Sequence, residues 1–315
     1  MADEPTIEPA SPGDARDQHR ERRIWWALVG LGAVIVLGIM ILLWPIIRGR
    51  LDAAKSLDTA TVIISQSDSD IELVARTVAA EPSAETSDVI ADVQRKIPPM
   101  RGELARGIAL LDVGYNRLTD DEQRRATLTR AVLAARVAML DAAAPILSAE
   151  ASAGIAAPDA AGAWDRAIQA SETEKAAVSA YDLKTTAGLT QAAALAKQAG
   201  DGFSAAEAGF GGAAAAFPAA KLDAYTAYMR QRTDELELLK RAIAARQAKN
   251  VAQANALVVQ YNAAQTRSAQ AARTLPGAPS PAIADALRLE VAAKRAAFDK
   301  AKSEADNADS ALKGL

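Results

Sequence analysis

Few residues in this chain have the types and spacing needed for chemistry. The only histidine is His19, which lies near the N-terminus, and cysteine is absent from the whole sequence. The bulk of the chain therefore lacks a histidine base, a His-ligated zinc, a thiolate nucleophile and a disulfide. We expect a protein that is not an enzyme, with no catalytic residue, no metal ligand and no cofactor.

Two short patterns resemble functional motifs without completing them. Ser310 and Lys313 have S-x-x-K spacing, but the S-D-N and K-T-G elements of serine acyl-transfer enzymes are missing. Asp68, Asp70 and Glu72 resemble the start of a calcium loop. That loop needs glycine at its sixth position, where this chain has leucine. We interpret the acidic residues as a solvated helix face or a helix cap.

The most apolar stretch runs from residue 24 to residue 47 and contains no charged side chain. As a helix it would extend for roughly 36 Å, slightly more than the ~30 Å hydrocarbon core of a bilayer. Trp25 and Trp26 stand at one end and Trp44 at the other, where tryptophan anchors a helix in the membrane interface. A signal peptide has a shorter apolar region and a small-residue cleavage site. The pattern predicts an uncleaved transmembrane helix over 24–47, preceded by a disordered polar tail over 1–23.

Basic residues flank this predicted span on both sides: Arg16, Arg20, Arg22 and Arg23 precede it, and Arg48, Arg50 and Lys55 follow it. The positive-inside rule favours a cytoplasmic N-terminus by one charge. We expect the protein in the inner (cytoplasmic) membrane, with its C-terminal domain periplasmic or extracellular. We expect no second membrane-spanning stretch.

Composition predicts an all-α fold. Alanine, the strongest helix former, makes up about a quarter of the chain, while aromatic residues make up only 4%. We expect a soluble alanine-rich helical bundle with coiled-coil-like antiparallel hairpins after the transmembrane helix. Its regions are a first helical region (51–150), an Ala/Gly-rich region (151–217) and a C-terminal hairpin region (218–315). The net charge of −3 gives no basic surface for nucleic acid.

Local signals divide the bundle further. Thr119 and Glu122 have capping-box spacing, which predicts a helix start. Proline predicts interruptions: the pair at 98–99 should stop a short helix, and Pro145 should bend or end another. The stretch 151–163 is predicted to be a loop.

The C-terminal third has the clearest heptad spacing, which is carried by Leu222, Tyr225, Met229, Leu236, Leu239 and Ile243. Arg232 interrupts this stripe. A helix over 251–272 has one apolar side and one side rich in Gln and Asn. The Gln/Asn-rich side either lines a polar groove or is a solvated face. We expect this helix and the last one, with Phe298 in its seam, to form an antiparallel hairpin.

Phe203, Phe210 and Phe217 are spaced by seven residues within a stretch rich in glycine. On a helix they form one stripe, although glycine weakens that helix. One interpretation is a loosely held amphipathic helix packed on the bundle. The other is a docking segment for a partner or for the membrane surface, which makes these rings the candidate partner-docking residues.

Two classes of function remain. A single-pass membrane-anchored scaffold or accessory subunit would bind other envelope proteins or self-associate into a homo-oligomer. An extracytoplasmic ligand-binding or sensing domain is the alternative. Helical sensors commonly return through the membrane to a cytoplasmic output domain. The sequence after residue 47 predicts no such return, so we favour the scaffold.

Overall fold

The computed structural model describes residues 14–80 and 87–315, and the side chains of 37–80 and 88–315. All regular structure in these residues is helical, which confirms the all-α prediction. The elements are α1 (Asp14–Ala79), α2 (Ser87–Asp112), η1 (Tyr115–Arg117), α3 (Asp120–Asp182), α4 (Thr186–Ala216), η2 (Pro218–Ala220), α5 (Asp223–Gln247), α6 (Val251–Thr274) and α7 (Pro279–Lys313).

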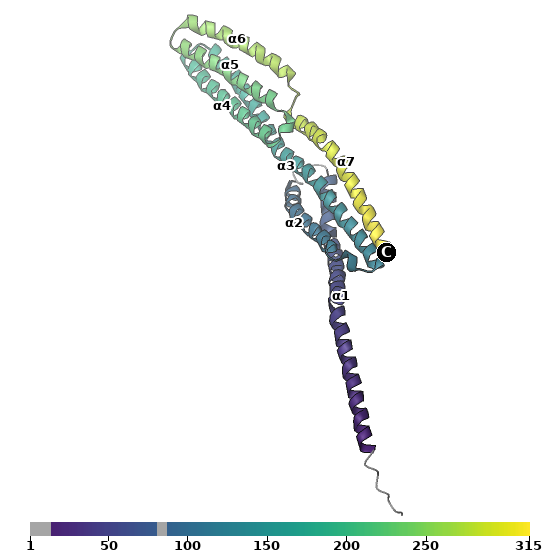
Figure 1. Cartoon of the computed structure of the whole chain (residues 1–315). Helices are drawn as coiled ribbons and strands as arrows, with labels where there is room; N and C mark the ends of the chain where they lie inside the picture. Colours follow the sequence, from purple (N-terminus) through teal and green to yellow (C-terminus); the bar gives the residue numbers. More distant parts are fainter. Residues whose placement is uncertain (1–13, 81–86) are drawn as a thin grey trace, which may run out of the picture.

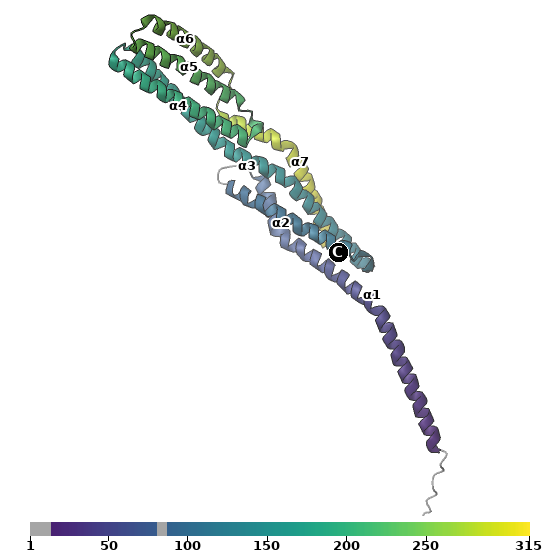
Figure 2. The ribbon, with the colours of Figure 1, turned by 60° about the vertical axis from the view of Figure 1, so that its left-hand side comes forward.

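The molecule is a long, curved rod with a single helical stalk (Figures 1 and 2). The stalk is the first part of α1, whose C-terminal part packs into the bundle. The 63 residues of α3 run along the rod for roughly 95 Å and contact helices at both of its ends. Helix α1 begins at Asp14, whereas we expected a disordered tail as far as residue 23; the tail before Asp14 lies outside the described residues.

One described helix, α3, is long and apolar enough to cross a membrane by length and composition, with a hydropathy of 1.6 over its most apolar 18 residues. We had expected no such stretch outside 24–47. Core helices pass the same test, and 44% of this stretch is buried among the helices that surround α3. Side chains 24–36 of the predicted span lie outside the described part.

The stalk-side half of the bundle is filled by branched and long aliphatic side chains from α1, α2, α3 and α7. We call this cluster the aliphatic core; its members include Leu57, Ile63, Leu104, Leu133, Met139, Leu140, Ile146, Leu147 and Phe298. Each lies in a helical stripe that faces the neighbouring helices, as expected of amphipathic helices. Phe298 is 3% exposed, in agreement with its predicted seam position.

The far half of the bundle is filled largely by alanine. We call this cluster the alanine core; its members include Ala156, Ala160, Ala163, Ala167, Ala170 and Ala177 of α3, Ala192, Ala196, Ala199, Phe203, Ala206 and Phe210 of α4, and Tyr225, Met229 and Leu236 of α5. Small side chains allow α3 and α4 to approach closely. A Cβ added to Gly202 would lie 2.9 Å from the Cβ of Ala170, and one added to Gly209 would lie 2.9 Å from the Cβ of Ala163.

The predicted helix stop at Pro98 and Pro99 and the predicted loop at 151–163 are wrong, and Pro145 does not end its helix, because these prolines lie inside continuous helices. Pro98 and Pro99 lie within α2, and Pro145 and Pro158 lie within α3. All four are exposed, so water can satisfy the carbonyl groups that lose their helical hydrogen bonds. The predicted loop 151–163 is therefore helical, and α3 crosses the predicted boundary at residue 150. The two cores nevertheless separate close to that boundary.

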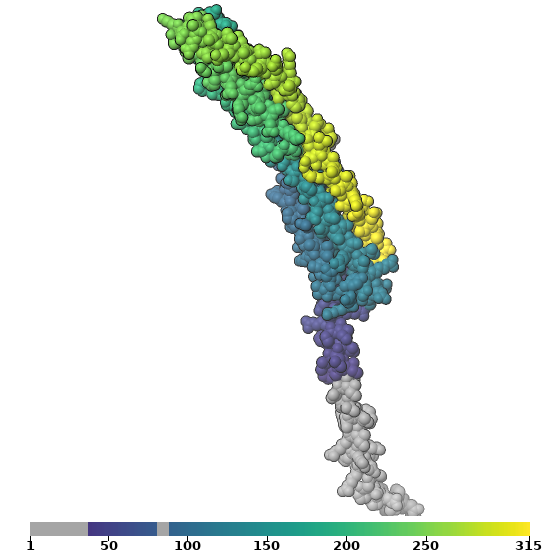
Figure 3. Space-filling view, turned by 45° about the horizontal axis from the view of Figure 1, so that its top comes forward, coloured from purple at the N-terminus to yellow at the C-terminus, as the bar shows by residue number. Residues whose placement is uncertain are grey.

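The predicted hairpin of the last two helices is also wrong. Helix α6 pairs with α5, and α7 turns away to pack along α3, as the yellow helix in Figure 3 shows. The seam of α7 was predicted correctly, but its partner was not, because two neighbouring helices both offer small-residue stripes. A further break, at Leu183–Thr185, separates α3 from α4, with Lys184 at φ 55°.

The capping box is confirmed. The Thr119 hydroxyl accepts a hydrogen bond from the Glu122 amide, and the Glu122 carboxylate accepts one from the Thr119 amide at 2.8 Å. These contacts satisfy two of the free backbone donors at the start of α3. They also hold down the pKa of Glu122, chiefly through the backbone hydrogen bond from Thr119.

Candidate functional site

A cluster of buried charges lies inside the alanine core, where α3, α5 and α6 meet. It contains Glu174 of α3 together with Arg232 and Glu235 of α5, whose side chains are 3%, 11% and 0% exposed. Burying charges is costly unless they are paired and hydrogen-bonded. The cluster is therefore a feature that the packing of the bundle alone does not require.

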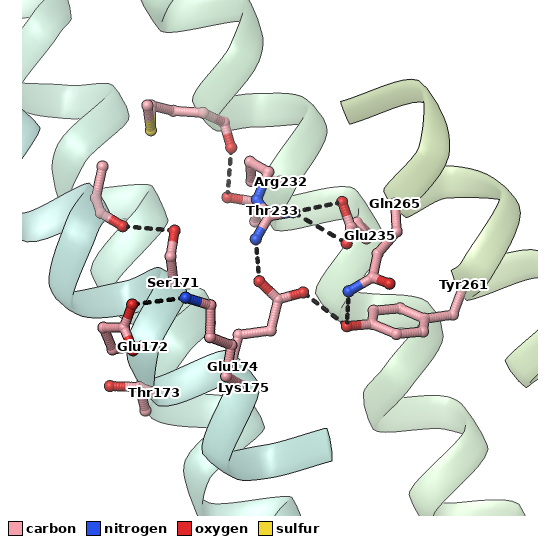
Figure 4. A network of polar contacts seen from close by, with 12 residues as sticks. Ser171, Glu172, Thr173, Glu174, Lys175, Arg232, Thr233, Glu235, Tyr261 and Gln265 are labelled. Carbon is pink, nitrogen blue, oxygen red and sulfur yellow. Dashed lines mark hydrogen bonds and ion pairs between the residues drawn. The ribbon is translucent and has the colours of Figure 1, made fainter. Parts of the chain in front are cut away.

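Arg232 stands between the two carboxylates. Its Nη1 donates to both carboxylate oxygens of Glu235, at 3.1 and 3.0 Å, and its Nη2 donates to Oε2 of Glu174 (Figure 4). One guanidinium thus joins α5 to α3. Since two carboxylates share one cation, the cluster carries an excess negative charge when both are ionised.

Helix α6 completes the cluster with neutral groups. The hydroxyl of Tyr261 donates to Oε1 of Glu174 at 2.8 Å, and the Nε2 of Gln265 donates to the Tyr261 oxygen at 2.7 Å (Figure 4). Tyr261 is 3% exposed and also belongs to the alanine core. Its hydrogen bond links α6 to α3, whereas α6 otherwise packs mainly against α5.

Burial controls the protonation of this cluster. It raises the pKa of Glu235 to about 7, against the opposing effect of the Arg232 charge, and Glu174 raises that pKa further. Burial also raises the pKa of Tyr261, as does the neighbouring Glu174. Tyr261 therefore remains a proton donor at neutral pH, while Glu235 changes its charge near neutrality.

The heptad positions of the helices place these side chains inward. Glu174 lies between Ala170 and Ala177 in the buried stripe of α3, and Arg232 lies between Met229 and Leu236 in that of α5. Charged residues at such seam positions point into the bundle as their apolar neighbours do.

An open groove lies directly over the cluster, between α3 and α6, with α5 as its floor. Its volume is about 720 Å³, and its lining includes Ser171, Glu174, Tyr228, Arg232, Asn262 and Gln265. The helices α5 and α6, which contribute to its lining, lie at the far end of the rod from the stalk (Figure 1). Two amides of the predicted Gln/Asn-rich side, Asn262 and Gln265, line its α6 wall, so part of that side borders a polar groove.

The phenylalanine stripe lies inside the alanine core, in agreement with the first of its two interpretations. Phe203 and Phe210 are 0% exposed and Phe217 is 3% exposed, so none of these rings is presented to a partner in this conformation. The guanidinium carbon of Arg232 lies 4.9 Å from the Phe203 ring centroid, and Phe210 stacks on Tyr225 at 5.2 Å. The expected weak helix is continuous, and two of its glycines, Gly202 and Gly209, lie in close contact with α3.

The remaining candidate residues lie apart from this site. The predicted membrane anchor Trp44 is 62% exposed on the stalk, and the side chains of Trp25 and Trp26 lie outside the described residues. The acidic residues at 68–72 lie inside α1 and form ion pairs with basic side chains. The Ser310 hydroxyl donates to the carbonyl of Asp306 within α7. Side chains able to hold a metal ion do not cluster anywhere in the part that the structure describes.

Sequence reasoning found part of this site. It noted that Arg232 interrupts a heptad stripe and that α6 has an amide-rich side, but it did not single out Glu174 or Glu235. A signal for Glu174 was present, because a carboxylate replaces alanine in an alanine stripe of regular spacing. Glu235 lies beside the main stripe of α5, so only the three-dimensional packing identifies it.

Comparison with known proteins adds no relative. The chain matches no protein-family model, and neither the curated proteins nor the solved structures yield a significant match.

Proposed function

We propose that this protein is a single-pass membrane-anchored helical scaffold or accessory subunit. Its rod holds a binding surface away from the membrane for another envelope protein or for a second copy of the chain. The anchor is residues 24–47, the N-terminus is cytoplasmic and the bundle is periplasmic or extracellular.

The observation that carries the proposal is the continuity of α1. One helix, Asp14–Ala79, contains the whole apolar stretch and then contributes Leu57, Ile63 and Val74 to the aliphatic core. An anchor joined to its domain without a flexible linker fixes the direction of the rod, which suits a scaffold.

Exposure on the stalk supports the anchor. The apolar side chains in the second half of the stretch are between 45% and 73% exposed; they are Leu37, Ile39, Met40, Ile41, Leu42, Leu43, Trp44, Ile46 and Ile47. They point in all directions around the helix, so one packing partner along one side would leave most of them in water. A bilayer covers every side.

Membrane fractionation of the full chain tests the anchor. Leu37→Arg with Ile39→Arg places two charges within the apolar stretch, each costing roughly 2.5–3.5 kcal/mol near the centre of a span. We expect the wild type in the alkali-resistant membrane fraction and the double variant lost from it. The matched control is Leu51→Arg with Val62→Arg, at exposed α1 positions beyond the stretch, and it should stay in the membrane. A soluble wild type would refute the anchor.

Orientation and assembly are tested separately. A reporter that is active only outside the cytoplasm, fused after Leu315, should be active; activity of a cytoplasm-only reporter there would reverse the orientation. Purification in mild detergent should yield a homo-oligomer or a stoichiometric complex with another envelope protein. A monomeric, partner-free chain would count against the scaffold.

The groove favours a second candidate function, an extracytoplasmic ligand-binding domain. Binding sites typically enclose about 300–1,000 Å³, and the volume of this groove falls within that range. The enzyme classes that need histidine or cysteine remain unsupported by its lining.

A further inference from the structure

We propose that the groove between α3 and α6 binds a neutral glycan chain. This inference rests on the second candidate function, ligand binding, and names the class of ligand. It does not depend on the scaffold role.

The basic side chains that line the groove are already paired within the protein. Arg232 is held by Glu174 and Glu235, and Lys175, the remaining basic residue of the lining, pairs with Glu172 at 2.7 Å. A strongly anionic ligand would have to compete with these ion pairs, and the excess negative charge of the cluster lies on Glu174 and Glu235, which are only 3% and 0% exposed to a cation. The groove is therefore better matched to a neutral ligand.

Neutral hydrogen-bonding groups remain available on both walls. The Tyr228 hydroxyl and the Asn262 amide make no side-chain hydrogen bond within the described part of the chain, and both line the groove. The hydroxyls of Ser171 and Thr266 donate to backbone carbonyls of their own helices, which leaves their lone pairs free. Gln265 donates through Nε2 and keeps its side-chain carbonyl available.

This set of groups matches a polyhydroxylated ligand. Each sugar hydroxyl is both a donor and an acceptor, so it can pair with an amide, a phenol or a hydroxyl lone pair. The ring of Tyr228 adds a face with partial negative charge, on which the polarised C–H groups of a sugar ring can stack. The open shape of the groove admits a chain and not only a single small molecule.

A peptide fits this surface less well. Peptide recognition commonly adds an exposed strand edge, a groove for an apolar helix face, or aromatic-lined pockets for proline. The described residues form no strand, and the aliphatic side chains of the lining are only Val178 and Ala269.

Calorimetric titration of the full chain in detergent with a β-1,4-linked N-acetylglucosamine tetramer tests the proposal. The tetramer is neutral, and its acetamide groups can pair with Asn262 and Gln265. We expect saturable binding with one site per chain. Asn262→Ala removes an exposed amide from the groove without disturbing the core and should weaken binding about tenfold.

The matched control is Gln260→Ala, which removes an exposed amide from α6 outside the groove and should leave affinity unchanged. Equal losses in the two variants, or no saturable binding by the wild type, would overturn the glycan proposal. A capped tetra-alanine peptide is titrated in parallel. If only the peptide binds, in a manner sensitive to Asn262→Ala, the glycan proposal fails and ligand binding survives. If neither binds, both fail and the scaffold stands alone.

Discussion

The two halves of the rod are packed by different means. The aliphatic core fills the space between α1, α2, α3 and α7 with leucine, isoleucine and valine, so its stability comes mainly from buried apolar volume. The alanine core brings α3 and α4 together across alanine and glycine, and then fills the gap towards α5 with aromatic rings. One half thus resembles an ordinary amphipathic bundle, and the other depends on close backbone approach and a few large side chains.

The buried arginines of the two halves, Arg136 and Arg232, differ in how deeply their carboxylate partners are buried. In the aliphatic half, Arg136 is 5% exposed, but its carboxylate partners Asp68 and Asp309 are 58% and 23% exposed and remain in contact with water. In the alanine half, both carboxylates around Arg232 are almost fully buried. The first arrangement is a side chain reaching towards the surface. The second keeps a charged group in the interior, directly beneath the groove.

The largest expected effect comes from the aromatic rings of the alanine core. Replacing Phe203, Phe210 and Phe217 together with serine should unfold α4 and α5, since deleting one buried phenylalanine typically costs about 3–5 kcal/mol. The summed cost of losing three such rings is comparable to the whole ~5–15 kcal/mol stability of a typical domain. Circular dichroism and hydrogen exchange should show lost protection in α4 and α5, with protection retained in α1 and α2.

The same triple variant separates the two interpretations of the phenylalanine stripe. Unchanged thermal unfolding together with loss of a copurifying partner would mean that the rings dock a partner and that α4 moves to present them. Unchanged unfolding and unchanged partners would contradict both interpretations.

Next in size is the difference between the two buried arginines. Arg232→Met leaves two buried carboxylates without a cation and should cost about 3 kcal/mol at pH 8. Arg136→Met should cost only about 1–2 kcal/mol, because water can reach its former carboxylate partners and the buried Ser67 hydroxyl loses only one neutral acceptor contact. Chemical denaturation of both variants measures the difference. Equal losses would mean that the exposure of the partners does not set the cost of an unpaired carboxylate here.

The difference between the halves also explains which features of the fold and of the candidate site could be predicted from the sequence. Helical class, the capping box at Thr119, the seam position of Phe298 and the amide-rich side of α6 follow from local propensity and spacing, and the structure agrees with each. Which helices pack against each other cannot be predicted from the sequence, because an alanine stripe fits many surfaces equally well. The effect of the prolines could not be predicted, because it depends on whether they face solvent, and exposure is a property of the packed bundle.

The pH dependence of stability comes third. Since the folded-state pKa of Glu235 is raised from 4.5 to about 7, its contribution is fully present below pH 4.5 and is lost as pH rises through 7. Between pH 6 and pH 8 the loss should be about 1 kcal/mol. Glu235→Gln mimics the protonated side chain, so the variant should gain stability relative to wild type by that amount over this range.

Denaturation of both proteins at several pH values isolates this effect. Burial also raises the pKa of Glu150, but that residue is present in both proteins and its contribution cancels. A stability difference that stays constant from pH 6 to pH 8 would show that Glu235 does not titrate there. Its charge would then not change beneath the groove near neutral pH.

The smallest effect tests whether close approach, and not glycine flexibility, holds α4 against α3. Gly209 and Gly211 lie two residues apart in the same helix. A Cβ at Gly209 would meet Ala163 at 2.9 Å, whereas one at Gly211 would meet nothing within 4 Å.

Alanine stabilises a helix interior by about 0.5–1 kcal/mol relative to glycine. Gly211→Ala should therefore raise the melting temperature by a few degrees. Gly209→Ala should lower it, because the gain in propensity is smaller than the roughly 1–3 kcal/mol cost of overpacking. Two changes of the same sign would mean that the contact between α3 and α4 is loose enough to absorb a methyl group.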